Sequence, residues 1–234
     1  MSRPQEETLR QGLIELKLPI TDAQVAQLLD YLALIQKWTK VYNLTAVREP
    51  AEMLTHHLLD SLAVINPLRK QLNSLNSAQD YAEGVTPEVT LDPSTRLLDV
   101  GSGAGLPGVV IAICCPQLTV HCVDAVAKKA AFVQQVAASL RLPNLRGIHA
   151  RVETLKEPYD LVSSRAFASL VDFTVGSRAA LAGPGIWMAM KGKHPADEIS
   201  ALPADVQVFH VEQLAVPGLN AERCVVWMRR ALGS

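Results

Sequence analysis

The apolar residues of this chain follow two periods, one up to about residue 65 and another from residue 96 onward. In the first part apolar side chains recur every three or four positions, as Val25, Leu28, Leu29 and Leu32 do, and this spacing predicts amphipathic helices. They are expected over residues 6–18, from 21 past 38, and over 51–65. In the second part, strands are expected at 96–100, 118–124, 145–150, 159–163, 186–191, 206–211 and 222–229, and helices at 107–115, 126–141, 167–181 and 195–202.

This order of elements predicts an α/β fold. Regular alternation of strands and helices is typical of a mainly parallel sheet with helices on both faces. Residues 96–234 are expected to form that core, and residues 1–67 an N-terminal helical cap. Residues 68–95 are polar and rich in Asn, Ser and Pro, so we expect a linker or surface insertion there. In such a sheet, ligands bind at the carboxyl ends of the strands.

The first strand of the core runs into a cluster of glycines. Gly103, Gly105 and Gly108 match G-x-G-x-x-G, a spacing typical of dinucleotide-binding loops. Asp99, however, ends the strand just before the loop, where a carboxylate repels a pyrophosphate and attracts a cation. S-adenosylmethionine (SAM) carries an ammonium and a sulfonium group and no phosphate. The pattern D-x-G-x-G-x-G, formed by Asp99, Gly101, Gly103 and Gly105, therefore favours SAM. A nicotinamide-dependent oxidoreductase and a glycine turn without a ligand remain as alternatives.

Further candidate side chains follow the other strands. Asp124, 21 positions after Gly103, is placed to accept both ribose hydroxyls of a nucleoside, or to cap the next helix. Glu153 lies in the loop expected beside the adenine, or is a solvated loop acid. Arg165 follows the fourth strand, where its planar fork can hold a phosphate or a base edge, or pair with a nearby acid. Lys191 occupies the equivalent place after the fifth strand.

Composition narrows the class of protein further. A net charge of −1 and a pI near 6.6 argue against nucleic-acid binding by bulk electrostatics, so any such contact must come from a local group of basic residues. The four cysteines show no C-x-x-C spacing and predict buried free thiols in a reducing compartment. No apolar stretch approaches the length of a membrane span, and residues 1–8 show no secretory signal. We therefore expect a cytoplasmic protein that is not attached to a membrane.

A metal site is not expected. His56 and His57 are adjacent and precede Asp60, but neighbouring residues point to different faces of a helix and chelate poorly. A structural role for His57, or a contact with substrate, fits its position better.

Several motifs together resemble one known family. Their order along the chain is similar to that of the RsmG (GidB) family, bacterial SAM-dependent methyltransferases of small-subunit ribosomal RNA, and the resemblance covers nearly the whole chain. The motifs are W-T-K-V-Y-N-L-T-A-V-R (38–48), H-L-L-D-S-L (57–62), D-V-G-S-G-A-G-L-P-G (99–108), S-R-A-F-A-S-L (164–170) and a lysine-glycine pair (191–192).

The resemblance implies a Rossmann-like SAM-dependent methyltransferase fold, with a sheet of seven strands whose last strand is antiparallel, behind an N-terminal helical cap. It also implies SAM contacts at Gly101, Leu106, Val152, Glu153 and Arg165. The family often has Ala-Glu or Glu-Glu where this chain has Val152 and Glu153. A contact made by the backbone at that position is unaffected by the change, whereas a side-chain contact is not.

The implied reaction is methylation of guanine N7 in the 530 loop of 16S rRNA, at position 527. N7 is an unprotonated lone pair, so in-line methyl transfer needs no general base, and Arg165 is expected to orient the guanine or its phosphate. The target base has to leave its stack to be reached. The partner is thus 16S rRNA or the small ribosomal subunit, and the alternatives are another RNA, a small molecule, or RNA binding without catalysis. Candidate RNA contacts are Lys40, Arg48, His57, Lys128 and Lys191.

Overall fold

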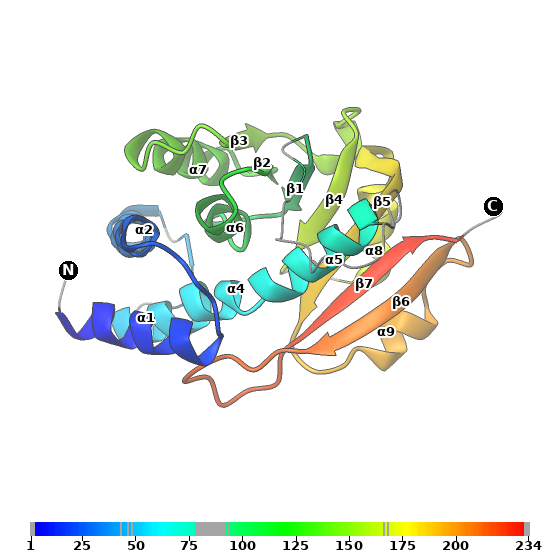
Figure 1. The fold of residues 1–234 in the computed structure, drawn as a ribbon. Helices are drawn as coiled ribbons and strands as arrows, with labels where there is room; N and C mark the ends of the chain where they lie inside the picture. Colours follow the sequence, from blue (N-terminus) through cyan, green and yellow to red (C-terminus); the bar gives the residue numbers. More distant parts are fainter. Residues whose placement is uncertain are drawn as a thin grey trace.

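A seven-stranded sheet forms the centre of the computed structural model, which describes residues 3–42, 44–45, 47, 49–77, 92, 94–165, 167 and 169–231. The strand order is β3-β2-β1-β4-β5-β7-β6 (Figure 1). Strands β1 to β5 are parallel, and β7 is antiparallel to both of its neighbours, β5 and β6. The predicted α/β sheet with its antiparallel last strand is thereby confirmed. The strands are β1 (Arg96–Val100), β2 (Thr119–Asp124), β3 (Leu145–His149), β4 (Tyr159–Ser164), β5 (Leu181–Lys191), β6 (Val206–Gln213) and β7 (Cys224–Arg230).

Two buried cores lie on the two faces of this sheet, because successive side chains of a strand point to opposite faces. Leu97 of β1 belongs to one core and Leu98 to the other. The first core is covered by α6 (Gly108–Cys114), α7 (Ala127–Ser139) and the N-terminal helices. The second is covered by α8 (Leu170–Gly176), α9 (Ala196–Ser200) and the 3-10 turns at Val152–Thr154 and Arg178–Ala180.

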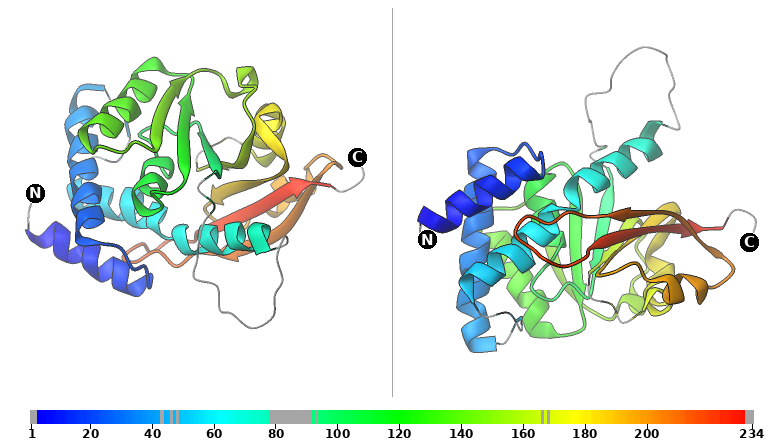
Figure 2. Two further views of the ribbon diagram at one scale, coloured as in Figure 1. Left: turned by 45° about the horizontal axis from the view of Figure 1, so that its top comes forward. Right: turned by 90° about the horizontal axis from the view of Figure 1, so that it is seen from below.

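The N-terminal helices pack as an outer layer over one face of the sheet (Figure 2). Leu28 and Leu58 are fully buried in the same core as Val109 of α6, so these helices share their hydrophobic contacts with the sheet. The segments are α1 (Arg3–Glu15), α2 (Asp22–Tyr42), α3 (Pro50–Met53), a π-helix (Leu54–Leu59), α4 (Asp60–Leu62) and α5 (Ile65–Ser77).

Helix α5 corrects the expectation for residues 68–95. Residues 68–77 are helical, and α5 crosses the boundary expected between cap and linker. Leu68 and Leu72, four positions apart, are buried and give the otherwise polar stretch one apolar stripe. The Arg69 guanidinium also donates to the Cys114 carbonyl at the end of α6, 2.8 Å away. Residues 78–91 and 93 lie outside the described part of the chain.

The region before β5 also differs from expectation. A helix was expected over 167–181, whereas α8 ends at Gly176 and β5 already begins at Leu181. The pairing of β4 with β5 shifts between Tyr159 and Leu161. The extra residues lie on β5, where the Gly-Pro-Gly sequence at 183–185 remains in the strand as an irregularity.

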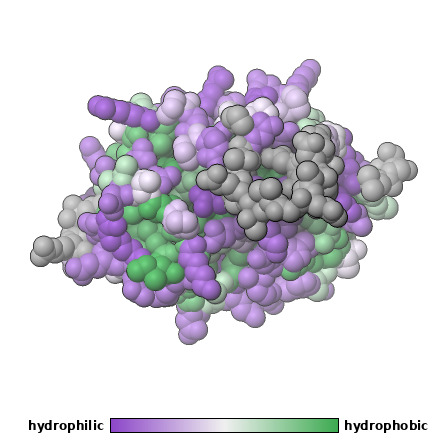
Figure 3. Space-filling view, viewed as in Figure 1, coloured by the Kyte–Doolittle hydropathy of each residue, from purple (hydrophilic) through white to green (hydrophobic). Residues whose placement is uncertain are grey.

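The surface seen in the view of Figure 3 is mainly hydrophilic, with hydrophobic residues exposed among polar ones toward the N-terminal helices. Within the described residues, no helix is both long and apolar enough to cross a membrane. All four cysteines are buried and free, as their spacing predicted.

Candidate functional site

The glycine loop between β1 and α6 has a conformation that only glycine adopts readily. Gly101, Gly103 and Gly105 have φ angles of +64°, +59° and +87°, in the left-handed region where a Cβ atom is unfavourable. Gly108 has another reason to lack a side chain, because a Cβ there would lie 2.4 Å from the Cys122 sulfur. Around Gly103, in contrast, a Cβ would meet no atom within 4 Å. The loop therefore presents open backbone at Gly103.

Asp99 holds this loop from inside the protein. Its side chain is fully buried, and its two carboxylate oxygens accept hydrogen bonds from the Gly108 amide (3.0 Å) and the Ser163 hydroxyl (2.9 Å). Burial raises the pKa of the Asp99 carboxyl to about 7, although both hydrogen bonds and the charge of Arg165 lower it. The position of Asp99 in the sequence had predicted a carboxylate directed at a ligand. The structure places the side chain beneath the loop, where it joins β1, β4 and α6.

Asp124 holds the loop from β2. One oxygen accepts from the Gly103 amide (3.0 Å) and the other from the Val126 amide (2.8 Å), at the start of α7. The Lys129 ammonium lies 3.8 Å away. Asp124 is not the cap residue of α7, which is Val126, but its carboxylate holds the Val126 amide just before the helix. The contact with a ribose stays a prediction.

A third contact comes from the N-terminal helices and was not anticipated. The Tyr31 hydroxyl of α2 donates to the Ala104 carbonyl at 2.6 Å. In the sequence, Tyr31 lies among the apolar residues of α2 and shows no feature that separates it from the core. Its contact depends on how α2 packs over α6, which the local pattern does not encode.

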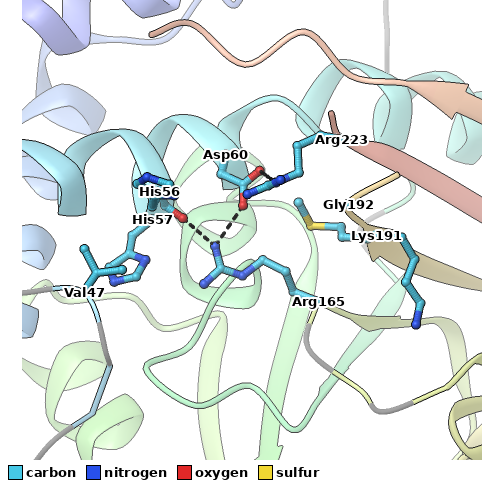
Figure 4. A pocket seen from close by; sticks show the side chains of 9 residues that line it. Val47, His56, His57, Asp60, Arg165, Lys191, Gly192 and Arg223 are labelled. Carbon is cyan, nitrogen blue, oxygen red and sulfur yellow. Dashed lines mark hydrogen bonds and ion pairs between the residues drawn. The ribbon is translucent and has the colours of Figure 1, made fainter. Parts of the chain in front are cut away.

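A charged cluster joins Arg165 to the helical layer (Figure 4). Asp60, buried at the start of α4, accepts from Arg165 (3.2 Å) through one oxygen and from Arg223 (3.0 Å) through the other. Arg165 also donates to the His56 carbonyl at 2.9 Å. The pairing with an acid that was considered for Arg165 is therefore present. Arg223, from the segment before β7, was missed because only the fold brings it to Asp60.

The π-helix explains why the His56 carbonyl is available. In an α-helix the amide of residue 60 would donate to the carbonyl of residue 56. Here the Asp60 amide donates to the carbonyls of Thr55 and His57 instead. The wider turn leaves the His56 carbonyl to accept from Arg165, and insertions of this kind often occur at functional sites.

These side chains surround a pocket with a volume of about 370 Å³ (Figure 4). His57, on its wall, is 4% exposed, and its Nε2 lies 2.9 Å from the Thr45 hydroxyl. Burial, followed by the charge of Arg165, lowers the pKa of His57 to about 4, so its imidazole is neutral at pH 7. The lining residues are Val47, His56, His57, Asp60, Arg165, Met190, Lys191, Gly192 and Arg223.

The remaining candidates lie around the carboxyl ends of the strands. Leu106 and Val152 are buried, and Glu153 is exposed on the 3-10 turn after β3. Lys191 lines the pocket, but its ammonium turns away to Glu198, with N–O distances of 2.8 and 3.1 Å. Lys40 is exposed in the last turn of α2.

Lys128 lies close to the end of α2. Its ammonium is 5.5 Å from the centre of the Tyr42 ring. Arg48 lies outside the described residues.

Within the described part of the chain, no group of three or more His, Cys, Asp or Glu side chains is arranged to hold a metal ion.

The loop suits a nucleoside cofactor without a pyrophosphate. A pyrophosphate needs free loop amides at a helix N-terminus. Here the amides of Gly103 and Gly108 already donate to Asp124 and Asp99, and those of Gly105 and Leu106 donate to the Ser102 carbonyl. The Asp124 carboxylate beside the loop also disfavours a phosphate group nearby. Open backbone at Gly103, with Asp124 and Glu153 at adjacent strand ends, is compatible with SAM.

Two solved structures share the fold of this chain. A SAM-dependent methyltransferase from Aquifex aeolicus superposes with a TM-score of 0.50 at 15% identity, over 77% of this chain and 98% of that one. TrmN from Thermus thermophilus superposes with a TM-score of 0.52 at 18% identity, over 76% and 53% of the two chains. The chain thus has the Rossmann-like fold of SAM-dependent methyltransferases.

The family follows from sequence similarity. The family described as GidB, rRNA small subunit methyltransferase G, matches residues 24–226. A protein named ribosomal RNA small subunit methyltransferase G from Albidiferax ferrireducens is 66% identical over 229 residues, covering 98% of this chain and 99% of its own length. The protein of that name from Acidovorax sp. strain JS42 is 65% identical over 224 residues, covering 96% and 95%. The chain belongs to the rRNA small subunit methyltransferase G family and is a methyltransferase, which confirms the resemblance inferred from its motifs.

Proposed function

We propose that this enzyme transfers the methyl group of SAM to N7 of a guanine in the 530 loop of 16S rRNA, at position 527. The observation that carries the proposal is the pocket at the end of β4, the strand next to β1, where Arg165 and Arg223 share the buried Asp60. Such a site can hold a nucleotide by its phosphate or base edge. It belongs to a chain whose relatives are named as methyltransferases of small-subunit rRNA.

The cofactor site of the proposal is the glycine loop with the adjacent ends of β2 and β3. The open backbone near Gly101 and Gly103 would hold the methionine part, Asp124 the ribose, and the turn at Val152 and Glu153 the adenine. Leu106 and Arg165 complete the set of residues taken from the family. The chemistry that SAM supplies when bound is an electrophilic methyl group on a positively charged sulfur.

The protein's own side chains are suited to a reaction without proton removal. Guanine N7 carries a lone pair and no proton, so a general base is not required. Asp60 is neutralised by two arginines, and His57 is held neutral beside Thr45. The task left to these residues is to orient the base in line with the methyl group and to exclude water. Such positioning contributes roughly 7–11 kcal/mol to catalysis in favourable cases.

The RNA surface of the proposal lies where α2 and α7 meet. Tyr42 is 45% exposed, and Val41 and Val126 beside it are exposed as well. Lys40 and Lys128 form no ion pair within the described residues, and Lys128 lies over the Tyr42 ring. An exposed aromatic ring with unpaired lysines suits a single-stranded nucleotide, which stacks its base and pairs its phosphate. Trp38 is partly buried against Phe132 (5.2 Å between ring centres) and so supports this surface from beneath.

The test uses SAM labelled on its methyl group with four separate substrates. These are small ribosomal subunits, free 16S rRNA, tRNA and DNA, prepared from cells that lack the protein, and cleavage at 7-methylguanine maps the product. Label at position 527 alone supports the proposal. SAM binding without label in any of these pools would favour a small-molecule substrate, and label in tRNA would favour another RNA.

A further inference from the structure

Tyr31 connects the N-terminal helices to the cofactor loop through one hydrogen bond. Its side chain is fully buried, and its hydroxyl donates to the Ala104 carbonyl at 2.6 Å. Burial raises the pKa of Tyr31 well above its ordinary value, so the hydroxyl keeps its proton and remains a donor. A ring that is fully buried makes no direct contact with RNA.

The accepting carbonyl lies at the centre of the glycine loop. Ala104 is flanked by Gly103 and Gly105, both with positive φ, and glycines offer no side chains with which a loop can hold its own shape. The amide of Gly108, four residues after Ala104, donates to Asp99 rather than continuing a helical turn. The two acids hold the amides of Gly103 and Gly108, and the hydrogen bond from Tyr31 holds the Ala104 carbonyl between them.

The position of the Tyr31 ring is itself fixed. It stacks on Phe132 of α7, with 6.5 Å between ring centres and 28° between ring planes. The hydroxyl also lies 3.4 Å from the place where a Cβ of Gly105 would be. A donor held this rigidly orients the loop before any ligand binds, and preorganisation of this kind increases affinity because less ordering remains to be done on binding.

We propose that Tyr31 is a positioning residue for the cofactor, which holds the Ala104 carbonyl so that the glycine loop keeps the conformation that binds SAM. The inference rests on the proposed function, since it assumes that SAM binds at this loop. It gives α2 a second task beside that of carrying the surface around Tyr42.

The experiment compares Tyr31→Phe with Tyr159→Phe in the full-length protein. Tyr159 is the matched control, because its side chain is also buried and its hydroxyl lies 2.8 Å from His121 Nδ1, at the start of β4 and away from the loop. Loss of the donor to a buried carbonyl shifts the equilibrium of the loop away from the conformation that binds SAM by about tenfold. We therefore expect Tyr31→Phe to raise the Kd for SAM by about that factor. The KM for SAM should rise in parallel, while kcat at saturating SAM stays within about twofold. Tyr159→Phe should lower the Tm without changing either constant.

Two results would overturn the inference. One is an unchanged SAM affinity in Tyr31→Phe together with a lowered Tm, which would make Tyr31 a packing residue like Tyr159. The other would come from hydrogen exchange in the ligand-free protein. The inference predicts that the Gly105 amide, which donates to the Ser102 carbonyl at 2.8 Å, exchanges faster in Tyr31→Phe only. Equal exchange in wild type and Tyr31→Phe contradicts the loop-holding role. A wild-type protein that does not bind SAM refutes the proposed function instead, and the exchange measurement still decides the role of Tyr31 in the loop.

Discussion

Replacing Asp60 by Asn tests whether the arginine cluster is assembled by one buried charge. The Asp60 side chain is 6% exposed and accepts from Arg165 and Arg223, whose side chains are 21% and 23% exposed. Asn has the same shape but no charge and a single acceptor oxygen, so both arginines lose the opposite charge and one of them loses its hydrogen bond to residue 60. The guanidinium groups of Arg165 and Arg223 then lie close to each other with no negative charge between them.

The size of the effect follows from burial. Removing one partner of a fully buried ion pair costs about 3–5 kcal/mol, but solvent reaches both arginines and screens them, so we expect a loss of about 2 kcal/mol in the free energy of unfolding. For a chain of this length that corresponds to a fall in Tm of roughly 4–8 °C. Because Arg165 and Arg223 also lose their orientation toward the pocket, kcat/KM for the RNA should fall about 100-fold, with the Kd for SAM changed much less.

The measurements are urea unfolding, thermal unfolding and methyl transfer to rRNA. The matched control is Asp205→Asn, because Asp205 forms an ion pair with Arg178 at the surface, where both side chains are about one-third exposed. Exposed pairs contribute about 0–1 kcal/mol, and this pair is not part of the pocket. If Asp60→Asn behaves like Asp205→Asn in both stability and kcat/KM, then Asp60 does not organise the cluster and the reasoning is wrong.

Three further predictions concern the loop and the RNA surface. Because the pKa of Asp99 is raised in the folded state, protonation of this carboxyl stabilises the fold. The contribution is complete below the unfolded pKa of 3.8 and is lost as the pH rises through about 7. Urea unfolding at pH 4 and at pH 7.5 should therefore show that Asp99→Asn gains stability relative to wild type between these two values, by up to about 4 kcal/mol. Gly108→Ala should lower the free energy of unfolding by about 1–3 kcal/mol, because its Cβ would clash with Cys122. Gly103→Ala has space for the Cβ, so it should lower the free energy of unfolding only by the roughly 1–2 kcal/mol of its backbone conformation. Its main effect should be weaker SAM binding in calorimetry. Lys128→Gln should reduce the salt dependence of RNA binding by about one unit of slope in filter-binding titrations; an unchanged slope would remove Lys128 from the RNA surface.

The sequence predicted the glycine loop well because its requirements are local. The positive φ values at Gly101, Gly103 and Gly105 each demand glycine at one position, so the spacing alone locates the loop. The alternation of strands and helices likewise determined the sheet, since parallel strands with helical connections leave few topologies. The direction of the Asp99 side chain was not predictable, because burial under α6 is a tertiary property.

The contacts that sequence reasoning missed are those between distant segments. Asp60 lies 105 positions from Arg165 and 163 from Arg223, and no spacing rule connects residues so far apart. Residues 68–77 were not predicted as a helix because the stretch is mainly polar, and its buried side shows in the structure through Leu68 and Leu72. In each case the physical cause is packing of the N-terminal helices against the sheet, which a local pattern cannot contain.

The π-helix at residues 54–59 shows how local backbone geometry and these distant contacts depend on each other. The carbonyl of His56 is released when the Asp60 amide bonds elsewhere, and because it is partly removed from water it is stabilised by a donor from another segment. Arg165 provides it, and the same guanidinium reaches Asp60 one turn further on. A regular α-helix would use the His56 carbonyl internally and leave Arg165 with Asp60 alone. The irregular turn is therefore stabilised by the arginine that it orients, and this mutual dependence joins the helical layer to the end of β4, where the proposed chemistry takes place.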